Sequence, residues 1–489
     1  MRIFIIPFLF LLFLLPSPNA QAKIIRVPAD SSCIQCAING AVDGDTVLVA
    51  RGHYYERINF LGKAILVTSN FIFDNDTTTI DSTIIDGDSL VGDTGSVVVF
   101  VSREDSSSVI KGFTIRNGIG TLDESGYRNG GGIYCLFSSP TISHNLIKGN
   151  SAISGTGGAI CCDVASRPIV RNNLIIANSA IYGGGIFCLL VSSPTISNNS
   201  ILNNSAVSYG GGICCVEYSA PLIDSNSIIG NSAFAGGGIC CMYYSPPTIT
   251  NNAILGNSAE SYGGAIYCAG NSSSTIRNNT LIKNFANYGG GIYCDHSSPT
   301  INNNIILTSL QGEGILCEYE SYPRICYNNV WNNADGNFFG CPIGVGDTTW
   351  GINFNGTPCD SFYNIIRDPL FIDTITFELL CNSPCIDAGD PSIYVPIDSG
   401  GCRIDMGTHE YSYILGDANS DGTITPKKPR GGAVNIGDVA YIINYLFVNG
   451  PSPCPYHAAD PNCDGWANIA DAVCLINYLF VGGPLPCGF

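Results

Sequence analysis

The chain has 489 residues and a formal net charge of −18 at pH 7, and only 12% of its residues are charged. A nucleic-acid partner would need a clustered basic surface that displaces the counterions of the phosphates, so this charge argues against one. It suits a divalent cation such as calcium, and the 57 glycines, together with abundant Asn and Ser, are typical of turn-rich repetitive β structure.

The first 22 residues have the pattern of a secretory signal peptide. Arg2 precedes an apolar run from Ile3 to Leu15, and a polar segment ends at Ala22. The run is shorter than the roughly 18 residues of a membrane-spanning helix, and no later segment reaches that length. We therefore expect a secreted or cell-surface protein whose mature chain starts near Lys23 and has no membrane span.

A short amphipathic helix is expected soon after the mature start. The apolar residues Ile34, Ala37, Ile38 and Ala41 have helical spacing, and the first strands follow them. A helix placed over the first coil of a repeat structure would protect an exposed sheet edge.

Eight copies of a GG-x-I-x-C unit dominate the middle of the chain. Their isoleucines follow one another at spacings of 27, 26, 27, 26, 27, 26 and 23 residues. They are Ile133, Ile160, Ile186, Ile213, Ile239, Ile266, Ile292 and Ile315. So steady a period predicts a solenoid in which each repeat forms one coil.

Each repeat holds three short runs with period-two alternation, of the types GIYC, PTIS and NxIL. Turns with Gly, Asn or Ser-Pro separate these runs and leave no room for a helix. Three strands per coil predict a parallel β-helix with about a dozen coils. A leucine-rich repeat has an overlapping period, but its L-x-x-L-x-L strand is absent from this sequence.

Two columns of asparagine mark turns between these strands. The first column is Asn145, Asn173, Asn199, Asn226, Asn252, Asn279, Asn304 and Asn328, and the second is Asn150, Asn178, Asn204, Asn231, Asn257 and Asn284. Asparagine tolerates left-handed backbone conformations, and its side-chain amide can bond the turns above and below.

A column of cysteines follows the repeat isoleucines by two residues. It consists of Cys135, Cys162, Cys188, Cys215, Cys241, Cys268, Cys294 and Cys317. Strand alternation turns these cysteines inward with the isoleucines. Cβ atoms stacked about 4.8 Å apart do not suit a disulfide, which needs about 3.8 Å, so we expect reduced thiols that fill the core.

The remaining cysteines have other expected roles. Cys161, Cys214 and Cys240 precede column cysteines and are expected to face outward as exposed thiols. Because the total of 23 is odd, at least one cysteine is free or pairs between chains. We expect the disulfides among the cysteines outside the repeat.

The residue directly after each repeat isoleucine forms another column, with one member in the equivalent strand of each coil. It consists of Tyr134, Cys161, Phe187, Cys214, Cys240, Tyr267, Tyr293 and Leu316, and Tyr182, Tyr209, Tyr262 and Tyr288 lie nearby. This column faces outward if isoleucine and cysteine face inward. Its rings Tyr134, Phe187, Tyr267 and Tyr293 are candidate polysaccharide-binding residues, since aromatic rings stack on sugars. Equally, stacked aromatic rings can simply stabilise the face of a sheet.

Several segments resemble a known superfamily. The stretch IIRVPADSSCIQCAINGAVDGDTVLVARGHYYERI, the GFTIRNG at residues 112–118 and the Asn-rich coils resemble the right-handed parallel β-helix proteins of the pectin-lyase-like superfamily. The NSA-x-x-x-GGAIYC arrangement looks like the repeat of polymorphic outer-membrane proteins, and RDPLFID, SPCIDAGDP and RIDMGTHEY resemble the end of many secreted β-helix proteins. The resemblance covers residues 23–413 and implies an all-β fold. It implies no single activity, because the superfamily includes lyases, hydrolases, epimerases and non-catalytic adhesins.

The run DPNCDGWANIAD near the C-terminus has the spacing of a calcium loop. Its positions 1, 3, 5, 7, 9 and 12 are Asp460, Asn462, Asp464, Trp466, Asn468 and Asp471, with Gly465 at position 6. Calcium needs several oxygen ligands around a tight glycine turn, and Trp466 would contribute its backbone carbonyl. A helix ended by glycines and proline follows the loop.

An earlier segment repeats this loop with an interruption. It supplies Asp417, Asn419, Asp421 and Thr423, and then Asn435 and Asp438 after ten excess residues with basic character. Either the insert loops out and the first loop still binds calcium, or this loop is a weak calcium site. We favour survival because the later ligands and the helix are intact.

The paired loop-helix units of residues 416–489 resemble the dockerin module, which implies calcium as cofactor and a cohesin-like protein partner. In well-known dockerins a Ser-Thr pair at loop positions 10 and 11 carries recognition. Here those positions are Ile436-Gly437 and Ile469-Ala470, which departs from that pattern.

The repeat columns contain no catalytic constellation. Their outward acids Asp163, Glu217, Asp224 and Asp295 stand at unlike registers, and His296 beside Asp295 is expected to be solvated surface. Arg171 and Arg277 share a register, but four coils place them roughly 19 Å apart. Asp387 and Asp390 are expected to form turns.

The sequence therefore predicts a β-helix over residues 23–413 joined to a calcium-binding module over residues 416–489. The expected role is to present an extended surface to a polysaccharide or cell-surface glycan while the module docks to a partner. The alternative is a polysaccharide lyase or glycoside hydrolase of polysaccharide breakdown, whose active residues lie around residues 60–130 or 330–400.

Overall fold

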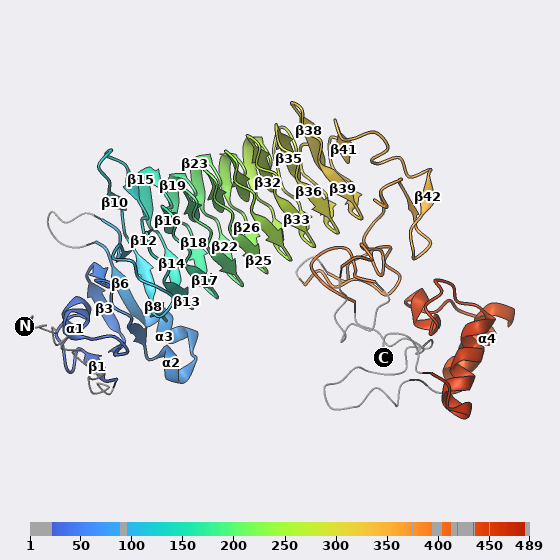
Figure 1. Ribbon diagram of the computed structural model, residues 1–489, viewed down its shortest axis with the longest axis horizontal. Coiled ribbons are helices and arrows are strands. Elements are labelled where there is room, and N and C mark those ends of the chain that lie inside the picture. The colour runs from blue at the N-terminus through green and yellow to red at the C-terminus, as the bar shows by residue number, and fades with distance from the viewer. Residues whose placement is uncertain are drawn as a thin grey trace, which may run out of the picture.

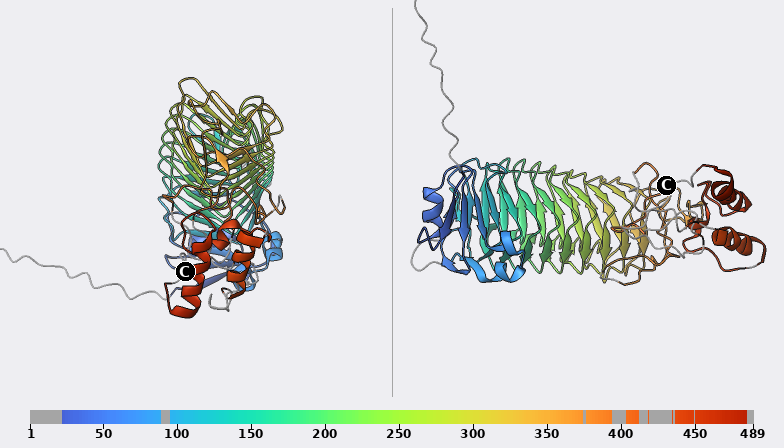
Figure 2. Two further views of the ribbon diagram at one scale, coloured as in Figure 1. Left: turned by 90° about the vertical axis from the view of Figure 1, so that its right-hand side faces the viewer. Right: turned by 90° about the horizontal axis from the view of Figure 1, so that it is seen from below.

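The computed structural model describes residues 22–88, 95–373, 376–393, 403–411, 418, 434, 436–448 and 450–484. These residues form a long parallel β-helix and, beyond its C-terminal end, a small helical module (Figures 1 and 2). The leader predicted at residues 1–22 lies outside the described residues except for its last residue. Among the described helices, none has the length and apolar character needed to cross a membrane.

Three long sheets form the walls of the β-helix, and each coil adds one strand to each. Sheet A has the strand order β1 (Ile24–Val27), β2 (Thr46–Val49), β5 (Leu66–Ser69), β8 (Val109–Lys111), β13 (Thr141–Ser143), β17 (Ile169–Arg171), β21 (Thr195–Ser197), β25 (Leu222–Asp224), β29 (Thr248–Thr250), β33 (Thr275–Arg277), β36 (Thr300–Asn302) and β39 (Arg324–Cys326). Sheet B has β3 (Gly52–Tyr55), β6 (Thr83–Asp86), β9 (Thr114–Arg116), β14 (Leu146–Lys148), β18 (Leu174–Ile176), β22 (Ser200–Leu202), β26 (Ser227–Ile229), β30 (Ala253–Leu255), β34 (Thr280–Ile282), β37 (Ile305–Leu307) and β40 (Asn329–Trp331). Sheet C has β4 (Ile58–Asn59), β7 (Val98–Phe100), β12 (Ile133–Leu136), β16 (Ile160–Asp163), β20 (Ile186–Cys188), β24 (Ile213–Cys215), β28 (Ile239–Cys241), β32 (Ile266–Ala269), β35 (Ile292–Asp295), β38 (Ile315–Glu318) and β41 (Phe338–Phe339). The PTIS, NxIL and GIYC runs lie in sheets A, B and C, so the prediction that each of the three runs forms a strand is confirmed.

Like residues stack on like along the core, because the strands pair parallel and in register. Ile196 of sheet A pairs with Ile223, which pairs with Ile249. These side chains are fully buried and form one continuous apolar core with the isoleucines and column cysteines of sheet C. All eight column cysteines are buried and unbridged, so the prediction of reduced thiols is confirmed.

The first asparagine column forms a ladder of buried amides between sheets A and B. Asn199 donates through Nδ2 to the Val170 carbonyl at 2.9 Å and to Oδ1 of Asn226 at 3.0 Å, and its own Oδ1 accepts from Nδ2 of Asn173. The predicted bonding to the turns above and below is thus confirmed. The left-handed residue is the one before the ladder asparagine, as at Asn198 with φ 54°, so the ladder residues themselves do not adopt that conformation.

A fourth sheet, which the sequence did not predict, lies over the outer face of sheet C. Sheet D has the strand order β10 (Thr121–Leu122), β11 (Arg128–Asn129), β15 (Ser151–Thr156), β19 (Ser179–Tyr182), β23 (Ser205–Tyr209), β27 (Ser232–Ala235) and β31 (Ser258–Tyr262). Its pairs are parallel from β11 onward. Residues from its strands, such as Ala235 and Tyr209, pack with the outward column of sheet C in a second apolar cluster.

Glycines allow sheet D to fold this closely onto sheet C. Gly210 has φ 68°, and a Cβ there would lie 2.5 Å from the Cβ of Cys214. A Cβ on Gly211 would lie 2.5 Å from the carbonyl oxygen of Gly237 in the next coil. The triple glycine of the repeat therefore reverses the chain at a place where no side chain fits.

Short helices cover the N-terminal end of the β-helix (Figure 1). Helix α1 (Ile34–Gly40) lies where the sequence predicted a helix and buries Ile34, Ala37 and Ile38 against the first coil. Helices α2 (Phe71–Asp74) and α3 (Thr77–Ser82) lie over the start of sheet B, where Phe71 and Ile80 pack with Leu146. Helix α1 thus covers the first coil, whereas α2 and α3 cover apolar side chains on sheet B.

The described residues between 359 and 411 form a C-terminal cap over the outer face of sheet B. Ile305 and Leu307 of that face pack with Ile365, Leu379 and Met406 in an apolar cluster of their own. A two-stranded antiparallel sheet, β42 (Gly351–Ile352) and β43 (Pro358–Cys359), precedes the cap. The cap therefore covers the outer face of sheet B in the last coils.

The C-terminal module consists of α4 (Ile436–Val448), the 3-10 helix η2 (Tyr456–Ala459), α5 (Ile469–Ile476) and the π-helix η3 (Asn477–Val481). Helices α4 and α5 pack together around Val439, Ile442, Ala472 and Leu475. This apolar interior belongs to the module alone and is separate from the core of the β-helix.

A disulfide and several side-chain contacts join the module to the C-terminal cap. A disulfide joins Cys381 of the cap to Cys454, and Nδ1 of the buried His457 lies 3.2 Å from Oδ2 of the buried Asp387. The His457 ring also lies 4.7 Å from the ring of Phe354. This disulfide and the Cys33–Cys36 disulfide of the N-terminal cap lie outside the repeat, as predicted.

We expect few reactive thiols in the native protein. Of the free cysteines in the described residues, Cys341 and Cys474 are partly exposed and all others are buried. Burial also raises the pKa of the Cys385 thiol to about 12. A thiol-reactive dye should therefore label those two positions quickly in buffer and the repeat cysteines only in denaturant, as peptide mapping by mass spectrometry would show. Rapid native labelling of the repeat cysteines would contradict this packing.

Candidate functional site

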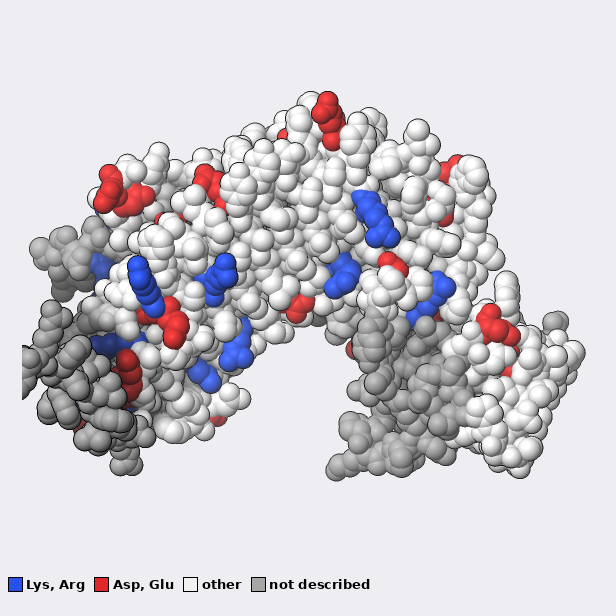
Figure 3. Space-filling view, viewed as in Figure 1, with Lys and Arg blue, Asp and Glu red and all other residues white. Residues whose placement is uncertain are grey.

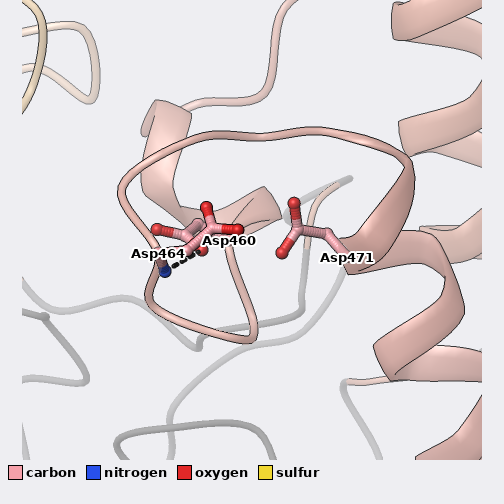
Figure 4. A group of neighbouring side chains, drawn as sticks. All are labelled: Asp460, Asp464 and Asp471. Carbon is pink, nitrogen blue, oxygen red and sulfur yellow. Dashed lines mark hydrogen bonds between the residues drawn. The ribbon is translucent and has the colours of Figure 1, made fainter.

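The loop from Asp460 to Asp471 brings three carboxylates together (Figure 4). The loop follows η2, turns at Gly465, whose φ of 92° is left-handed, and ends in the first turn of α5. One ligand oxygen from each of Asp460, Asp464 and Asp471 lies within 4.8 Å of the others, and the three side chains point toward one another. The spacing in the sequence thus produces a real cluster in space.

Backbone amides of the loop hold the first ligands in place. Asp460 accepts hydrogen bonds from the amides of Asp464 at 3.1 Å and Gly465 at 2.8 Å. Oδ1 of Asn462 accepts from the Asp464 amide at 2.8 Å, and Oδ1 of Asp464 accepts from the Trp466 amide at 3.0 Å. The ligand side chains therefore also order the loop that carries them.

Asp471 is bonded through one oxygen only. Its Oδ2 accepts from the Asn468 amide at 2.7 Å, while Oδ1 of Asn468 accepts from the Ala470 amide at 2.8 Å, which completes a capping box for α5. Oδ1 of Asp471 is buried and has no hydrogen-bond partner. Burial, together with the negative charges of Asp460 and Asp464, raises the pKa of Asp471 to about 7. A bound cation would relieve both effects.

These residues fit a calcium ion. Calcium takes six to eight oxygen ligands in a flexible arrangement, and the loop offers three carboxylates, two amide oxygens and the Trp466 carbonyl. Trp466 and Asn468 are also close to each other, since Nδ2 of Asn468 donates to the Trp466 carbonyl at 3.0 Å. The unpartnered oxygen of Asp471 is a donor atom that the protein itself leaves unused. The role of each ligand stays a prediction.

The interrupted first loop lies almost wholly outside the described residues. This applies to Asp417, Asn419, Asp421, Thr423 and Asn435. Asp438 is described and is buried in the first turn of α4. A second calcium ion at this loop therefore stays a prediction.

The expected outward aromatic surface of sheet C is wrong. Tyr134, Phe187, Tyr267 and Tyr293 are only 6%, 4%, 7% and 1% exposed. Cys161, Cys214 and Cys240, which were expected as exposed thiols, are fully buried in the same cluster. Alternation does turn this column away from the main core, but sheet D covers it, so these rings cannot stack on a sugar.

Acids of neighbouring coils satisfy the hydroxyl groups of these buried tyrosines. The hydroxyl of Tyr134 donates to Asp163 at 3.0 Å, and that of Tyr267 donates to Asp295 at 3.1 Å. Burial raises the pKa of Asp163. The acids at the ends of sheet C strands thus have a structural role.

The other candidate residues also lie apart from any catalytic arrangement. Nδ1 of His296 lies 2.6 Å from Oδ1 of Asp295 on an exposed turn, with the His296 side chain 57% exposed. Arg171 and Arg277 belong to strands of sheet A that β21, β25 and β29 separate. Asp390 accepts from the amide and hydroxyl of Ser392 and forms the predicted turn.

A polar cluster that the sequence did not predict lies on sheet B near the N-terminal end. Asp86, which is buried, accepts from Nε of Arg116 at 2.7 Å and from Nδ2 of Asn117 at 2.8 Å, and lies 2.7 Å from Nε2 of His53. Burial alone would raise the pKa of Asp86, but hydrogen bonds from the Asp88 amide, Arg116, Asn117 and His53 lower it to about 2. The cluster joins β3, β6 and β9 across three coils. These early coils lack the regular repeat, so no sequence column pointed to it.

Comparison with known proteins agrees with both parts of the architecture. Residues 63–254 and 184–356 match the model of the right handed beta helix region, and residues 430–480 match the model of the dockerin type I domain. No curated protein matches the chain.

Solved structures of two polysaccharide lyases are similar to the chain. The crystal structure of pectate lyase Pel9A aligns with 15% identity over 80% of this chain and 96% of that chain, with a TM-score of 0.44. The structure of the PL6 family alginate lyase AlyGC aligns with 15% identity over 70% of this chain and 55% of that chain, with a TM-score of 0.35.

Proposed function

Because the chain belongs to the right-handed β-helix family and carries a dockerin type I match at its C-terminus, we propose that it is a polysaccharide-binding protein that docks to a partner through calcium. The β-helix presents an extended surface to a polysaccharide or cell-surface glycan. The C-terminal module, loaded with calcium, attaches the β-helix to a cohesin-like protein. The observation that carries the docking role is the carboxylate cluster of Asp460, Asp464 and Asp471, in which Asp471 is buried and has an unpartnered oxygen.

The module offers its partner an apolar surface. Ile436 and Phe447 of α4 are 56% and 67% exposed, and Ile469 of α5 and Phe480 of η3 are 51% and 67% exposed. These positions correspond in the two repeated units, so both helical segments carry the same apolar pattern. Ile436 and Ile469 hold loop position 10, which favours a partner that contributes apolar side chains rather than hydroxyl groups.

The attachment of the module to the cap supports a docking role at a defined orientation. The Cys381–Cys454 disulfide and the buried His457–Asp387 contact join the loop segment to the end of the β-helix. A partner bound to the module would therefore hold the β-helix at a set angle. The disulfides also suit a secreted or extracellular protein, since such bonds persist in oxidising surroundings.

The test uses the mature chain from Lys23 to Phe489 with calcium or with a chelator. Calorimetry measures calcium binding, and affinity gels with acidic and neutral polysaccharides measure retention and chain cleavage. We expect calcium binding, and retention without cleavage. Absence of calcium binding would overturn the docking role. Cleavage would replace the binding role with that of a lyase or hydrolase, and retention of no polysaccharide would overturn the glycan role.

A further inference from the structure

Exposed aromatic rings stand at the turns that lead from sheet C to sheet A. Tyr218, Tyr243, Tyr244 and Tyr319 are 61%, 58%, 52% and 60% exposed. The side chain of His296, at the same turn of another coil, is 57% exposed. We refer to these five residues as the corner rings. They lie outside the aromatic column that sheet D covers.

The backbone under the corner rings is firmly held. Met242, next to Tyr243, is 6% exposed and packs in the cluster between sheets C and D. On the other side of the ring pair, Ser245 donates from its amide to the hydroxyl oxygen of Ser272, and the same bond joins Ser219 to Ser245. A ladder of buried serines therefore fixes each turn. Rings held in this way lose little freedom when they bind a ligand.

The corner rings occupy positions that do not suit them. Tyr218, Tyr243 and Tyr244 have φ values of 62°, 54° and 62°, in the left-handed region where a large side chain is unfavourable. The next coil has Gly270 and Asn271 at the places of Tyr243 and Tyr244, as the hydrogen bond from the Tyr244 amide to the Gly270 carbonyl shows. Another coil has Leu190 and Val191 at these places, also with positive φ, so the turn accepts several types of residue. The turn itself therefore does not require tyrosine.

The corner rings form a ridge of two stacked pairs, which the coil of Gly270 and Asn271 separates. The rings of Tyr218 and Tyr244 are 5.3 Å apart with planes 8° from parallel, and those of His296 and Tyr319 are 5.4 Å apart at 5°. A Cβ on Gly270 would lie 3.6 Å from Cδ1 of Tyr243, so this ring lies beside the glycine of the next coil. Four steps between coils give the ridge a length of about 19 Å along the β-helix.

Charge near the ridge argues for an uncharged ligand. Residues 172–276, which contain Tyr218, Tyr243 and Tyr244, have no Lys or Arg. Figure 3 shows one face of the molecule and does not mark the corner rings; on that face, few Lys and Arg side chains lie at the centre of the β-helix. The exposed acids Glu217 and Glu320 adjoin the rings in the sequence. Carboxylates accept hydrogen bonds from sugar hydroxyls but repel a polyanion.

The shape of the ridge also selects among ligands. It is long and only one turn wide, whereas a stable protein interface needs about 800 Å² on each partner. A polysaccharide chain is long and narrow, with apolar C–H faces that stack on aromatic rings and hydroxyls that bond to the flanking acids. We propose that the corner rings bind an uncharged polysaccharide that lies along the axis of the β-helix. This inference rests on the proposed glycan role and names its site and ligand class.

The test replaces the two turn residues of one coil with those of the next coil. In the full mature chain, the double variant Tyr243→Gly/Tyr244→Asn copies Gly270 and Asn271. In affinity gels with uncharged polysaccharides such as xylan, galactomannan and mixed-linkage β-glucan, we expect the double variant to bind at least about tenfold more weakly than the wild type. The thermal unfolding temperature should stay the same or rise, because the variant removes left-handed tyrosines.

The control Tyr127→Asn removes a tyrosine that is 56% exposed but lies away from the ridge, and it should bind like the wild type.

Three outcomes would overturn the inference. The first is that the double variant binds the uncharged polymers as strongly as the wild type does. The second is retention of only polygalacturonate or alginate, which would leave the proposed glycan role intact but place it elsewhere. The third is self-association of the wild type that the double variant loses in analytical ultracentrifugation, because the ridge would then join two copies of the chain.

Discussion

Replacement of Asp471 by Asn should abolish calcium binding at the second loop. The substitution removes a charged ligand whose Oδ1 is buried and unpartnered, and calcium affinity depends strongly on the number of charged ligands. We expect affinity to fall on the order of 100-fold or more, so that calorimetry records one site fewer than in the wild type. Fluorescence of Trp466, which is 59% exposed at loop position 7, gives a second readout of the same event.

The same variant should behave in the opposite way without calcium. Burial raises the pKa of Asp471 to about 7, which means that the ionised carboxylate is unfavourable in the calcium-free loop. A neutral amide of the same shape should therefore make α5 harder to cleave by protease in chelator at pH 8, where the wild type is mostly ionised. A variant that merely damages the fold would be easier to cleave.

A matched control separates the site from the overall charge. Glu260→Gln also removes one negative charge, but it changes an exposed residue of sheet D far from the loop in sequence. It should keep the calcium stoichiometry and affinity of the wild type. Unchanged calcium binding by Asp471→Asn would show that the carboxylate cluster is not a metal site.

Replacement of Asn199 by Ala should destabilise the β-helix by about 3–5 kcal/mol, because several buried groups lose their partners at once. The Val170 and Ser197 carbonyls lose a donor, and the amide and Nδ2 of Asn173 lose their acceptor. Guanidinium denaturation followed by circular dichroism measures the change. We expect a lower midpoint of unfolding, with the calcium affinity of the module unchanged.

The adjacent residue provides a control of the same type. Asn198 is exposed and has φ 54°, so Asn198→Gly keeps the left-handed turn and removes no buried hydrogen bond. Its effect on the free energy of unfolding should stay within about 0.5 kcal/mol. Equal destabilisation by the two variants would mean that the ladder amides contribute nothing beyond the turn itself.

Much of the architecture follows from periodicity alone. The spacing of Ile133 and its seven equivalents defines the coil, and alternation within each run places isoleucine and the second cysteine inward. The structure confirms this because parallel coils in register impose the same environment at every repeat. The cluster of Asp460, Asp464 and Asp471 could also be predicted, since these residues lie within twelve consecutive residues and local turn geometry brings them together.

Clusters built from distant segments could not be predicted in this way. Asp86, His53 and Arg116 come from three coils of the irregular N-terminal part, where no column aligns them. The contact of His457 with Asp387 joins the module to the cap across 70 residues of sequence. Only the folded chain determines such neighbours, because they depend on where whole elements pack.

The sequence by itself determined the repeat, its inward residues and the clustering of Asp460, Asp464 and Asp471, because each of these depends on local spacing. Tertiary structure decided which outward residues reach solvent. The alternation of side chains along a strand predicts on which side of the strand a residue lies. It does not predict whether another part of the coil covers that side. Sheet D covers Tyr134 and Tyr293, whereas the left-handed turns leave Tyr218 and Tyr244 exposed.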